Sequence, residues 1–243
     1  MQRYQVITND ELMMIHENSM KIMDEIGIYM PYDPAKELLA KHGARVDGDT
    51  VHFPKAMVEA AIKSAPNSYT LNSRNPEKNV NITTQTTAYA GPYGSPFVTD
   101  RERGRRRSML SDFIEIVKIC DKLPGIDIQS HISCEPSDIA EADRPLTMVY
   151  NTTLFSEKPA MGSIFGYETS LKCIELASIP FGGLDAIKDK PVIASIPCTL
   201  TPLSFDGRQL GAIRAYAETG QVQLINSLSI AGMTTPATLA GLI

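Results

Sequence analysis

The sequence predicts an α/β protein, a partial (β/α)8 barrel of about five of the eight βα units, preceded by a small helical N-terminal region. Strands and helices alternate at a spacing of roughly 30 residues in the second half, which is typical of βα units on a parallel sheet. The strand segments are short and mostly apolar, as expected where both faces are covered. An open doubly wound sheet usually carries a glycine-rich phosphate loop, and no such motif occurs.

Residues 1–80 are predicted to form the helical region, with one small hairpin. The three predicted helices cover residues 8–27, 33–43 and 55–66. Thr8 and Glu11 form a capping box at the first N-terminus, and Gly27 is placed to end that helix. The hairpin is predicted to turn at Asp47-Gly48. We expect this region to pack against the larger domain, residues 81–243, or to support oligomer formation.

Residues 67–107 are rich in turn residues and favour β structure. The segment 97–107 predicts two short strands around a turn at Asp100–Gly104. It carries five arginines: Arg101, Arg103, Arg105, Arg106 and Arg107. Runs of charge usually face solvent, so a solvated hairpin is the expected state, with a phosphate or nucleic-acid site as the alternative. Local basic charge would also suit docking of an acidic partner.

The βα units follow along the rest of the chain. Strands are predicted near 88–98 and at 126–132, 160–166, 191–200 and 222–230, with helices between them. After the last strand, Thr235 and Pro236 predict the start of a further helix that continues to Ile243. Because a closed barrel needs eight such units, we expect the chain to be a truncated barrel.

Composition restricts the classes of partner. The chain has 243 residues, of which 43% are hydrophobic, and its net charge is -5. This charge argues against a general nucleic-acid binder. No stretch approaches the ~18 apolar residues of a membrane span, and the start lacks the pattern of a signal peptide. A cytoplasmic protein that binds neither nucleic acid nor membrane is therefore expected.

The four cysteines do not indicate a metal site. Cys120, Cys134, Cys173 and Cys198 are widely spread, whereas zinc sites usually show close Cys/His pairs. The nearest approach is His131 with Cys134, and a solitary buried cysteine is the simpler interpretation. We expect neither zinc nor a disulfide.

Four segments together resemble the trimethylamine methyltransferase superfamily. They are "ELMMIHENSMKIMDEIGIYM", "HGARVDGDTVHFPKAMVEAAIKSAP", "GSPFVTDRERGRRRSMLSDF" and "CTLTPLSFD". No one of them is diagnostic, but their order and spacing make the resemblance specific, and it runs through the whole chain. Members of this superfamily are similar in having a (β/α)8 barrel, and they are longer than this chain.

The resemblance implies transfer of a methyl group from a methylated amine, trimethylamine or a quaternary amine such as glycine betaine. The acceptor would be the Co(I) of a corrinoid (cobalamin) carried by a cognate partner protein. A quaternary ammonium has a neutral amine as its leaving group, so the reaction needs no Lewis acid and no general acid or base. Trimethylamine members carry pyrrolysine at a position beyond Ile243, and quaternary-amine members lack it. A homo-oligomer is also expected.

Candidate substrate-binding residues follow from position alone, at strand ends and in the loops after them. A quaternary ammonium binds well to aromatic faces, and a betaine carboxylate needs hydrogen-bond donors. The candidates are Tyr93, His131, Glu135, Phe165, Thr199 and Ser227. Each also has a structural alternative, such as packing on the barrel rim, a solvated charge or filling of the core.

Two other functions compete with the methyltransferase. A lyase or aldolase barrel would need a reactive lysine at the carboxyl end of a strand, but Lys158, Lys188 and Lys190 precede strands. A non-catalytic fragment that binds a small molecule or a partner is the second alternative. A free half-barrel would expose sheet edges and apolar surface, which argues against it.

Overall fold

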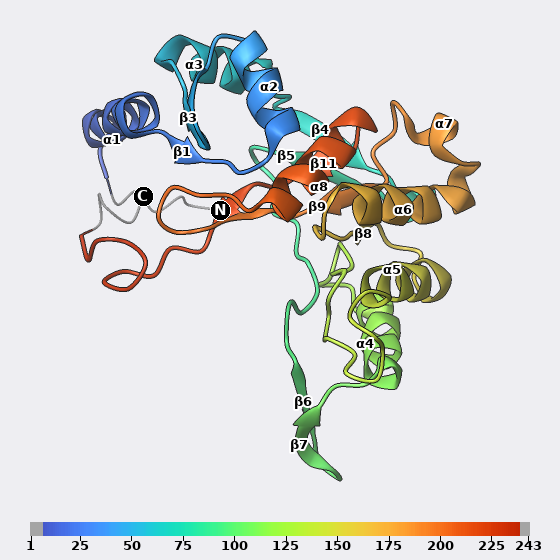
Figure 1. Ribbon diagram of the computed structural model, residues 1–243. Coiled ribbons are helices and arrows are strands. Elements are labelled where there is room, and N and C mark those ends of the chain that lie inside the picture. Colours follow the sequence, from blue (N-terminus) through green and yellow to red (C-terminus); the bar gives the residue numbers. More distant parts are fainter. Residues whose placement is uncertain (1–6, 239–243) are drawn as a thin grey trace. The chain divides into compact units, whose positions relative to one another are not determined.

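The computed structural model describes residues 7–238, which form helices and several small sheets (Figure 1). The described chain divides into two compact units. The first contains the described residues up to Pro66, Cys198–Leu210 and the described residues from Asn226 on; the second contains Asn67–Pro197 and Gly211–Ile225. The mixed α/β class is thus confirmed. The described strands close no barrel, and the division at residue 80 stays a prediction.

The N-terminal part of the first unit has three helices and a three-stranded antiparallel sheet. The helices are α1 (Asn9–Lys21), continued by a π-helical turn (Ile22–Ile26), α2 (Asp33–Lys41) and α3 (Lys55–Ser64). The strands, in sheet order, are β1 (Ile28–Tyr29), β3 (Thr50–His52) and β2 (Arg45–Asp47). The predicted capping box is present: the Thr8 N–H donates to Glu11 Oε2 at 2.7 Å, and the Glu11 N–H donates to Thr8 Oγ1 at 3.2 Å.

Two glycines shape this region. Gly27 ends the first helix as predicted, with φ at +82°, and a β-carbon there would lie 2.9 Å from the Val51 carbonyl oxygen. Only glycine fits that position without strain. In the hairpin, Asp47 pairs with Thr50, so the turn consists of Gly48 and Asp49, one residue later than predicted.

Two later segments complete the first unit. Strand β10 (Cys198–Thr199) pairs in parallel with β12 (Asn226–Ser227). The Tyr29 N–H donates to the Leu203 carbonyl at 2.9 Å, and the Phe205 N–H donates to the Tyr29 carbonyl at 3.0 Å. The edge of β1 is therefore paired with residues far along the chain.

The second unit is built around parallel strands. Its sheet has the order β11 (Val222–Gln223), β9 (Ile193–Ser195), β8 (Ala160–Met161). Single parallel bridges extend this order, from Ala160 to Gln129 and from Ile128 to Ala90. Segments near residues 90, 128, 160, 193 and 222 are thus parallel neighbours in their order along the chain.

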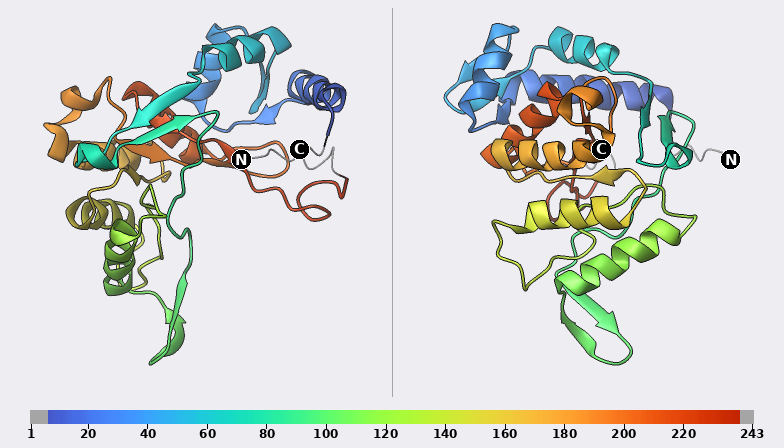
Figure 2. Two further views of the ribbon diagram at one scale, coloured as in Figure 1. Left: turned by 180° about the vertical axis from the view of Figure 1, so that it is seen from behind. Right: turned by 90° about the vertical axis from the view of Figure 1, so that its right-hand side faces the viewer.

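Helices cover this sheet. They are α5 (Arg144–Phe155), α6 (Tyr167–Ser178), the short α7 (Leu184–Ile187) after a 3₁₀ turn (Ile179–Phe181), and α8 (Gly207–Glu218), which begins in the first unit. α5 and α6 lie side by side (Figure 2). Ile193 of β9 is fully buried in one core cluster with Val149, Cys173, Ile174 and Tyr216 from these helices. On the other face of β9, Ala194 belongs to a second cluster with Leu71, Ile128 and Met161.

Two hairpins and α4 complete the second unit, which confirms the predicted β character of residues 67–107. β4 (Ser68–Leu71) pairs with β5 (Val80–Thr83) around a 3₁₀ turn (Pro76–Lys78), and Leu71 lies in the second core cluster. β6 (Phe97–Asp100) pairs with β7 (Gly104–Arg107), with the turn as predicted. α4 (Leu110–Lys122) follows and packs beside α5.

The strands differ from the predicted segments. The predicted strand 191–200 splits into β9 and β10, which belong to different units, because Pro197 lacks an N–H and interrupts the ladder. The segment 222–230 also splits, into β11 of the second unit and β12 of the first. Residues 235–238 are not helical, and Thr235 bridges Ala231; the rest of the predicted last helix, 239–243, lies outside the described residues.

Candidate functional site

Tyr93 and His131 form an aromatic pair in the second unit. Their ring centroids are 5.3 Å apart and their planes meet at 74°, an edge-to-face arrangement. Backbone bonds hold the two loops together, because the Gly94 N–H donates to the Ile132 carbonyl at 2.8 Å and the Gly91 N–H donates to the Ile128 carbonyl at 3.0 Å. Tyr93 is 47% exposed, whereas His131 is buried. The pair thus presents an aromatic ring to solvent over a buried imidazole.

His131 is electrically neutral at physiological pH. Burial lowers the pKa of His131 to about 4, because the interior disfavours the charged imidazolium. Its Nδ1 atom has no hydrogen-bond partner among the residues that the structure describes. Buried polar atoms in native proteins usually have a hydrogen-bond partner, so this atom is available to accept or donate one further bond. The imidazole can therefore offer a hydrogen bond without adding positive charge.

Further buried polar groups occur near the ends of β8, β9 and β11. Ser195 ends β9 and is the register partner of Gln223 at the end of β11. Three buried oxygens have no hydrogen-bond partner within residues 7–238: the Ser195 hydroxyl, the Gln223 side-chain oxygen and the Tyr216 hydroxyl. Burial raises the pKa of Tyr216 well above its usual value, with smaller contributions from Cys173 and Tyr93.

Sequence reasoning missed these polar groups, although one signal pointed to Tyr216. Gly162 follows β8 directly, and a β-carbon there would overlap the Tyr216 hydroxyl. An isolated glycine at a strand often marks such a close approach. Ser195 and Gln223 carry no comparable signal in the sequence. The surroundings of Gln223 depend on tertiary packing, because its amide donates to the Ile213 carbonyl of α8.

The other predicted residues of the second unit have distinct surroundings. Glu135 accepts a hydrogen bond from Arg144 Nη1 at 2.8 Å, so its carboxylate is already paired with a cation. Its backbone N–H donates to the Ser95 carbonyl, in the loop that carries Tyr93. Phe165 follows β8 and is 41% exposed, and its N–H donates to Ser163 Oγ at 3.1 Å.

Thr199 and Ser227 lie in the first unit. They are Cα partners in the parallel pair β10–β12, so the structure brings them together. Ser227 Oγ lies 2.9 Å from Ser229 Oγ. The six predicted residues are thus divided between the units, four in the second and two in the first, and their roles as substrate-binding residues stay predictions.

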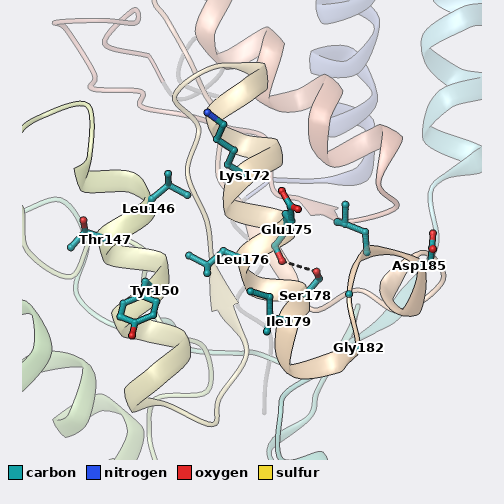
Figure 3. Close-up of a pocket in the computed structure, with 12 residues that line it drawn as sticks. Leu146, Thr147, Tyr150, Lys172, Glu175, Leu176, Ser178, Ile179, Gly182 and Asp185 are labelled. Atoms are coloured by element: carbon teal, nitrogen blue, oxygen red, sulfur yellow. Dashed lines mark hydrogen bonds between the residues drawn. The ribbon is translucent and has the colours of Figure 1, made fainter.

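A separate groove of about 860 Å³ lies on the helical face of α5, α6 and α7 (Figure 3). Leu146, Leu176 and Ile179 line it, and charged side chains such as Lys172 and Asp185 also border it. The Ser178 hydroxyl donates to the Glu175 carbonyl at 2.6 Å inside this surface. None of the six predicted residues lines the groove, so its size alone does not make it the site.

The cysteine thiols are protonated at neutral pH. Burial raises the pKa of Cys134 to about 11 and that of Cys173 to about 12. Among residues 7–238, no group of three His, Cys, Asp or Glu side chains is placed to hold a metal ion. Also within that range, no helix is both long enough and apolar enough to cross a bilayer. The expectation that zinc is absent stays a prediction.

The fold and the site define an α/β protein with parallel strand segments in chain order and an aromatic–imidazole pair. Buried polar atoms at two strand ends have no partner among residues 7–238. The chain belongs to the trimethylamine methyltransferase (MTTB) family, whose sequence model matches residues 1–243. The resemblance found in the sequence is therefore confirmed.

Individual relatives carry related names. A glycine betaine methyltransferase of Desulfitobacterium hafniense (strain Y51) is 42% identical over 239 residues, which cover 98% of this chain and 50% of the relative. A proline betaine:corrinoid methyltransferase of Eubacterium limosum is 24% identical, with 97% of this chain and 50% of the relative covered. A trimethylamine methyltransferase of D. hafniense (strain DSM 10664 / DCB-2) is 25% identical, with 96% and 48% covered. The chain spans about half the length of the curated relatives it matches.

Proposed function

We propose that this chain is part of an enzyme that transfers a methyl group from a methylated amine to a corrinoid carried by a cognate partner protein. Family membership supports this proposal, as does the similarity to methyltransferases named for glycine betaine, proline betaine and trimethylamine. The 42% identity to a glycine betaine methyltransferase favours a quaternary amine as the substrate.

The order of the parallel segments supports the barrel part of the proposal. Five segments are parallel neighbours in chain order, as in a (β/α)8 barrel, whereas a doubly wound sheet reverses its order at a switch point. We propose that these segments form about five of the eight units of such a barrel. Its site would lie at the carboxyl ends of the strands, where Tyr93, His131 and Phe165 follow their segments.

The observation that carries the proposal is the exposed Tyr93 ring against a neutral, buried His131. An aromatic face attracts a quaternary ammonium through its quadrupole, with about 0.5–2 kcal/mol per contact. A charged imidazolium at the same place would repel this cation, and the low pKa of His131 avoids that repulsion.

Two of the other candidates have supporting roles in this proposal. Phe165 would add a second aromatic face for the ammonium group. Thr199 and Ser227 belong to the first unit, so we assign them no part in this site of the second unit, and their substrate-binding role stays a prediction. Glu135 is paired with Arg144, so we assign it to holding the loop after residue 132 rather than to neutralising the substrate. When bound, the corrinoid supplies the Co(I) nucleophile. The chain's own groups hold the N-methyl group in line and exclude water.

The test uses the complete protein with its reduced corrinoid partner. Trimethylamine, glycine betaine, proline betaine and carnitine are added separately, and the Co(I) absorbance is followed. We expect loss of the Co(I) signal with at least one of these amines, and a slower loss in the Tyr93→Ala variant. A Co(I) signal that persists with every amine contradicts the proposed activity.

A further inference from the structure

The β6–β7 hairpin has two chemically different faces. Because Val98 pairs with Arg106, their side chains share the face toward α4. Val98 packs against the core cluster that contains Phe113 and Val117. Arg106 donates two hydrogen bonds to Asp112, at 2.6 and 2.5 Å, which raises the pKa of its guanidinium. This face is anchored to the second unit and its charge is neutralised.

The opposite face carries unneutralised cations. Phe97 pairs with Arg107, and Thr99 pairs with Arg105. The Arg105 guanidinium lies 4.0 Å from the centre of the Phe97 ring, and the Arg107 guanidinium lies 5.5 Å from it. Both arginines are exposed, and neither forms an ion pair with any residue in the described range 7–238.

The charge of this hairpin is opposite to that of the whole chain. The chain has a net charge of -5, yet residues 97–107 contain five arginines against Asp100 and Glu102. Ion pairs to Asp100 and Asp112 account for Arg103 and Arg106. Within residues 7–238, Arg101, Arg105 and Arg107 have no ion pair. Within the second unit, the hairpin extends beyond α4 as an arm (Figure 1). Its cations are thus presented away from the helices that carry it.

We propose that the Phe97–Arg107 hairpin is a docking arm for the acidic surface of a separate protein, with Arg105 and Arg107 binding its carboxylates. A guanidinium presents two parallel N–H donors that match a carboxylate. Contact with the Phe97 ring restricts both side chains before binding, which lowers the entropy lost on association. The anchored opposite face keeps the strand register fixed.

Two observations favour an acidic protein over a nucleic acid. Two guanidinium groups lie over the Phe97 ring, so a base that stacked on that side would have to displace them. Three arginines of the hairpin have no ion-pair partner among residues 7–238, fewer than the roughly 6–10 phosphate contacts that make duplex binding strongly salt-dependent. A patch of this size suits a few clustered carboxylates, and its contribution weakens as salt rises.

The proposal is tested by fluorescence anisotropy of the full chain with a labelled octaglutamate peptide at low ionic strength. We expect Arg105→Gln/Arg107→Gln to weaken binding about tenfold, since two charge-assisted contacts are lost. Lys172→Gln/Lys188→Gln removes the same charge from exposed lysines of the second unit and should change binding less than about twofold. Arg105→Lys/Arg107→Lys keeps the charge and should restore binding in part.

Three results would overturn the inference. One is a loss of binding in Lys172→Gln/Lys188→Gln as large as that in Arg105→Gln/Arg107→Gln, which would indicate a general charge effect. Another is stronger competition by a 20-base-pair DNA duplex or by inorganic phosphate than by unlabelled octaglutamate. The third is self-association in sedimentation velocity that the Arg105→Gln/Arg107→Gln change abolishes, because the arm would then join copies of this chain. None of these measurements depends on methyltransferase activity.

Discussion

The imidazole of His131 meets the phenol ring of Tyr93 edge to face, with 5.3 Å between the ring centroids. This contact places a buried, neutral base beneath an exposed aromatic ring. Because the backbones of the two loops are also hydrogen-bonded at Gly94 and Ile132, neither ring is positioned independently of the other. The pair is the best-defined element of the candidate site.

Tyr93→Ala should weaken binding of a quaternary amine to the complete protein. Loss of one cation–π contact predicts a rise in KM of about 2- to 30-fold, while Tyr93→Phe should stay near the parent value because the ring is retained. Steady-state kinetics with glycine betaine separates KM from kcat. Equal effects of the two substitutions would show that the hydroxyl, and not the ring, is the contact.

His131 should make stability fall as the pH is lowered from 6.5 to about 4. Its pKa in the folded state is about 4, against 6.5 for the free side chain, so the unfolded chain takes up the proton first. Unfolding is then favoured by about 2 kcal/mol at pH 5 relative to pH 7. Urea unfolding at several pH values measures this slope. His131→Gln should remove it, and the exposed His42→Gln should not.

Gly162→Ala should destabilise the second unit by about 1–3 kcal/mol through overpacking. The added methyl group would overlap the Tyr216 hydroxyl and lie 2.6 Å from Ile193 Cδ1. Tyr216→Phe removes a hydroxyl that has no hydrogen-bond partner among residues 7–238. By itself it should therefore change the free energy of unfolding only slightly. In a double-mutant cycle measured by thermal unfolding, Gly162→Ala should lower the free energy of unfolding less in the Tyr216→Phe protein than in the parent protein. Strict additivity would contradict the close approach.

Asp121 should stabilise the second unit as a carboxylate. Burial raises its pKa, but hydrogen bonds from the Glu157 N–H, Lys122, Ser156 and Lys78 lower it further, to well below its usual range. Asp121→Asn should therefore lower the free energy of unfolding by about 2–4 kcal/mol at pH 7.

The Asp121 effect has a defined pH window. The depressed pKa means that this stability is present above about pH 4 and is lost as the pH falls below it. Urea unfolding of the parent and of Asp121→Asn should thus converge in acid. Asp189→Asn, at an exposed position of the same unit, is the matched control, and a similar loss there would refute the assignment.

Local signals in the sequence predicted the elements that depend on local chemistry. The Thr8–Glu11 capping box, the stop at Gly27 and the β6–β7 turn are each determined by a few neighbouring residues. The division of the strand at Pro197 had a signal too, since proline cannot continue a ladder. That the two pieces belong to different units depends on long-range pairing, which no local pattern encodes.

The candidate site was less predictable, because its properties depend on burial. His131 was identified by position, but its neutrality follows from the tertiary packing around it. The Arg144 partner of Glu135 lies in the next helix, and no spacing rule indicated it. Ser195 and Gln223 look like ordinary strand residues in the sequence. The absence of a partner for their side-chain oxygens within residues 7–238 is a property of the folded chain that no local pattern indicates.

The discontinuous make-up of the first unit has a consequence for synthesis on the ribosome. Tyr29 emerges early, but the backbone groups that pair with it belong to Leu203 and Phe205. The Tyr29 edge of β1 therefore stays without these partners while most of the second unit is translated. An unpaired strand edge is prone to pair with other chains during such a delay. Nascent chains halted before residue 203 should thus depend on chaperones more than chains that have passed it.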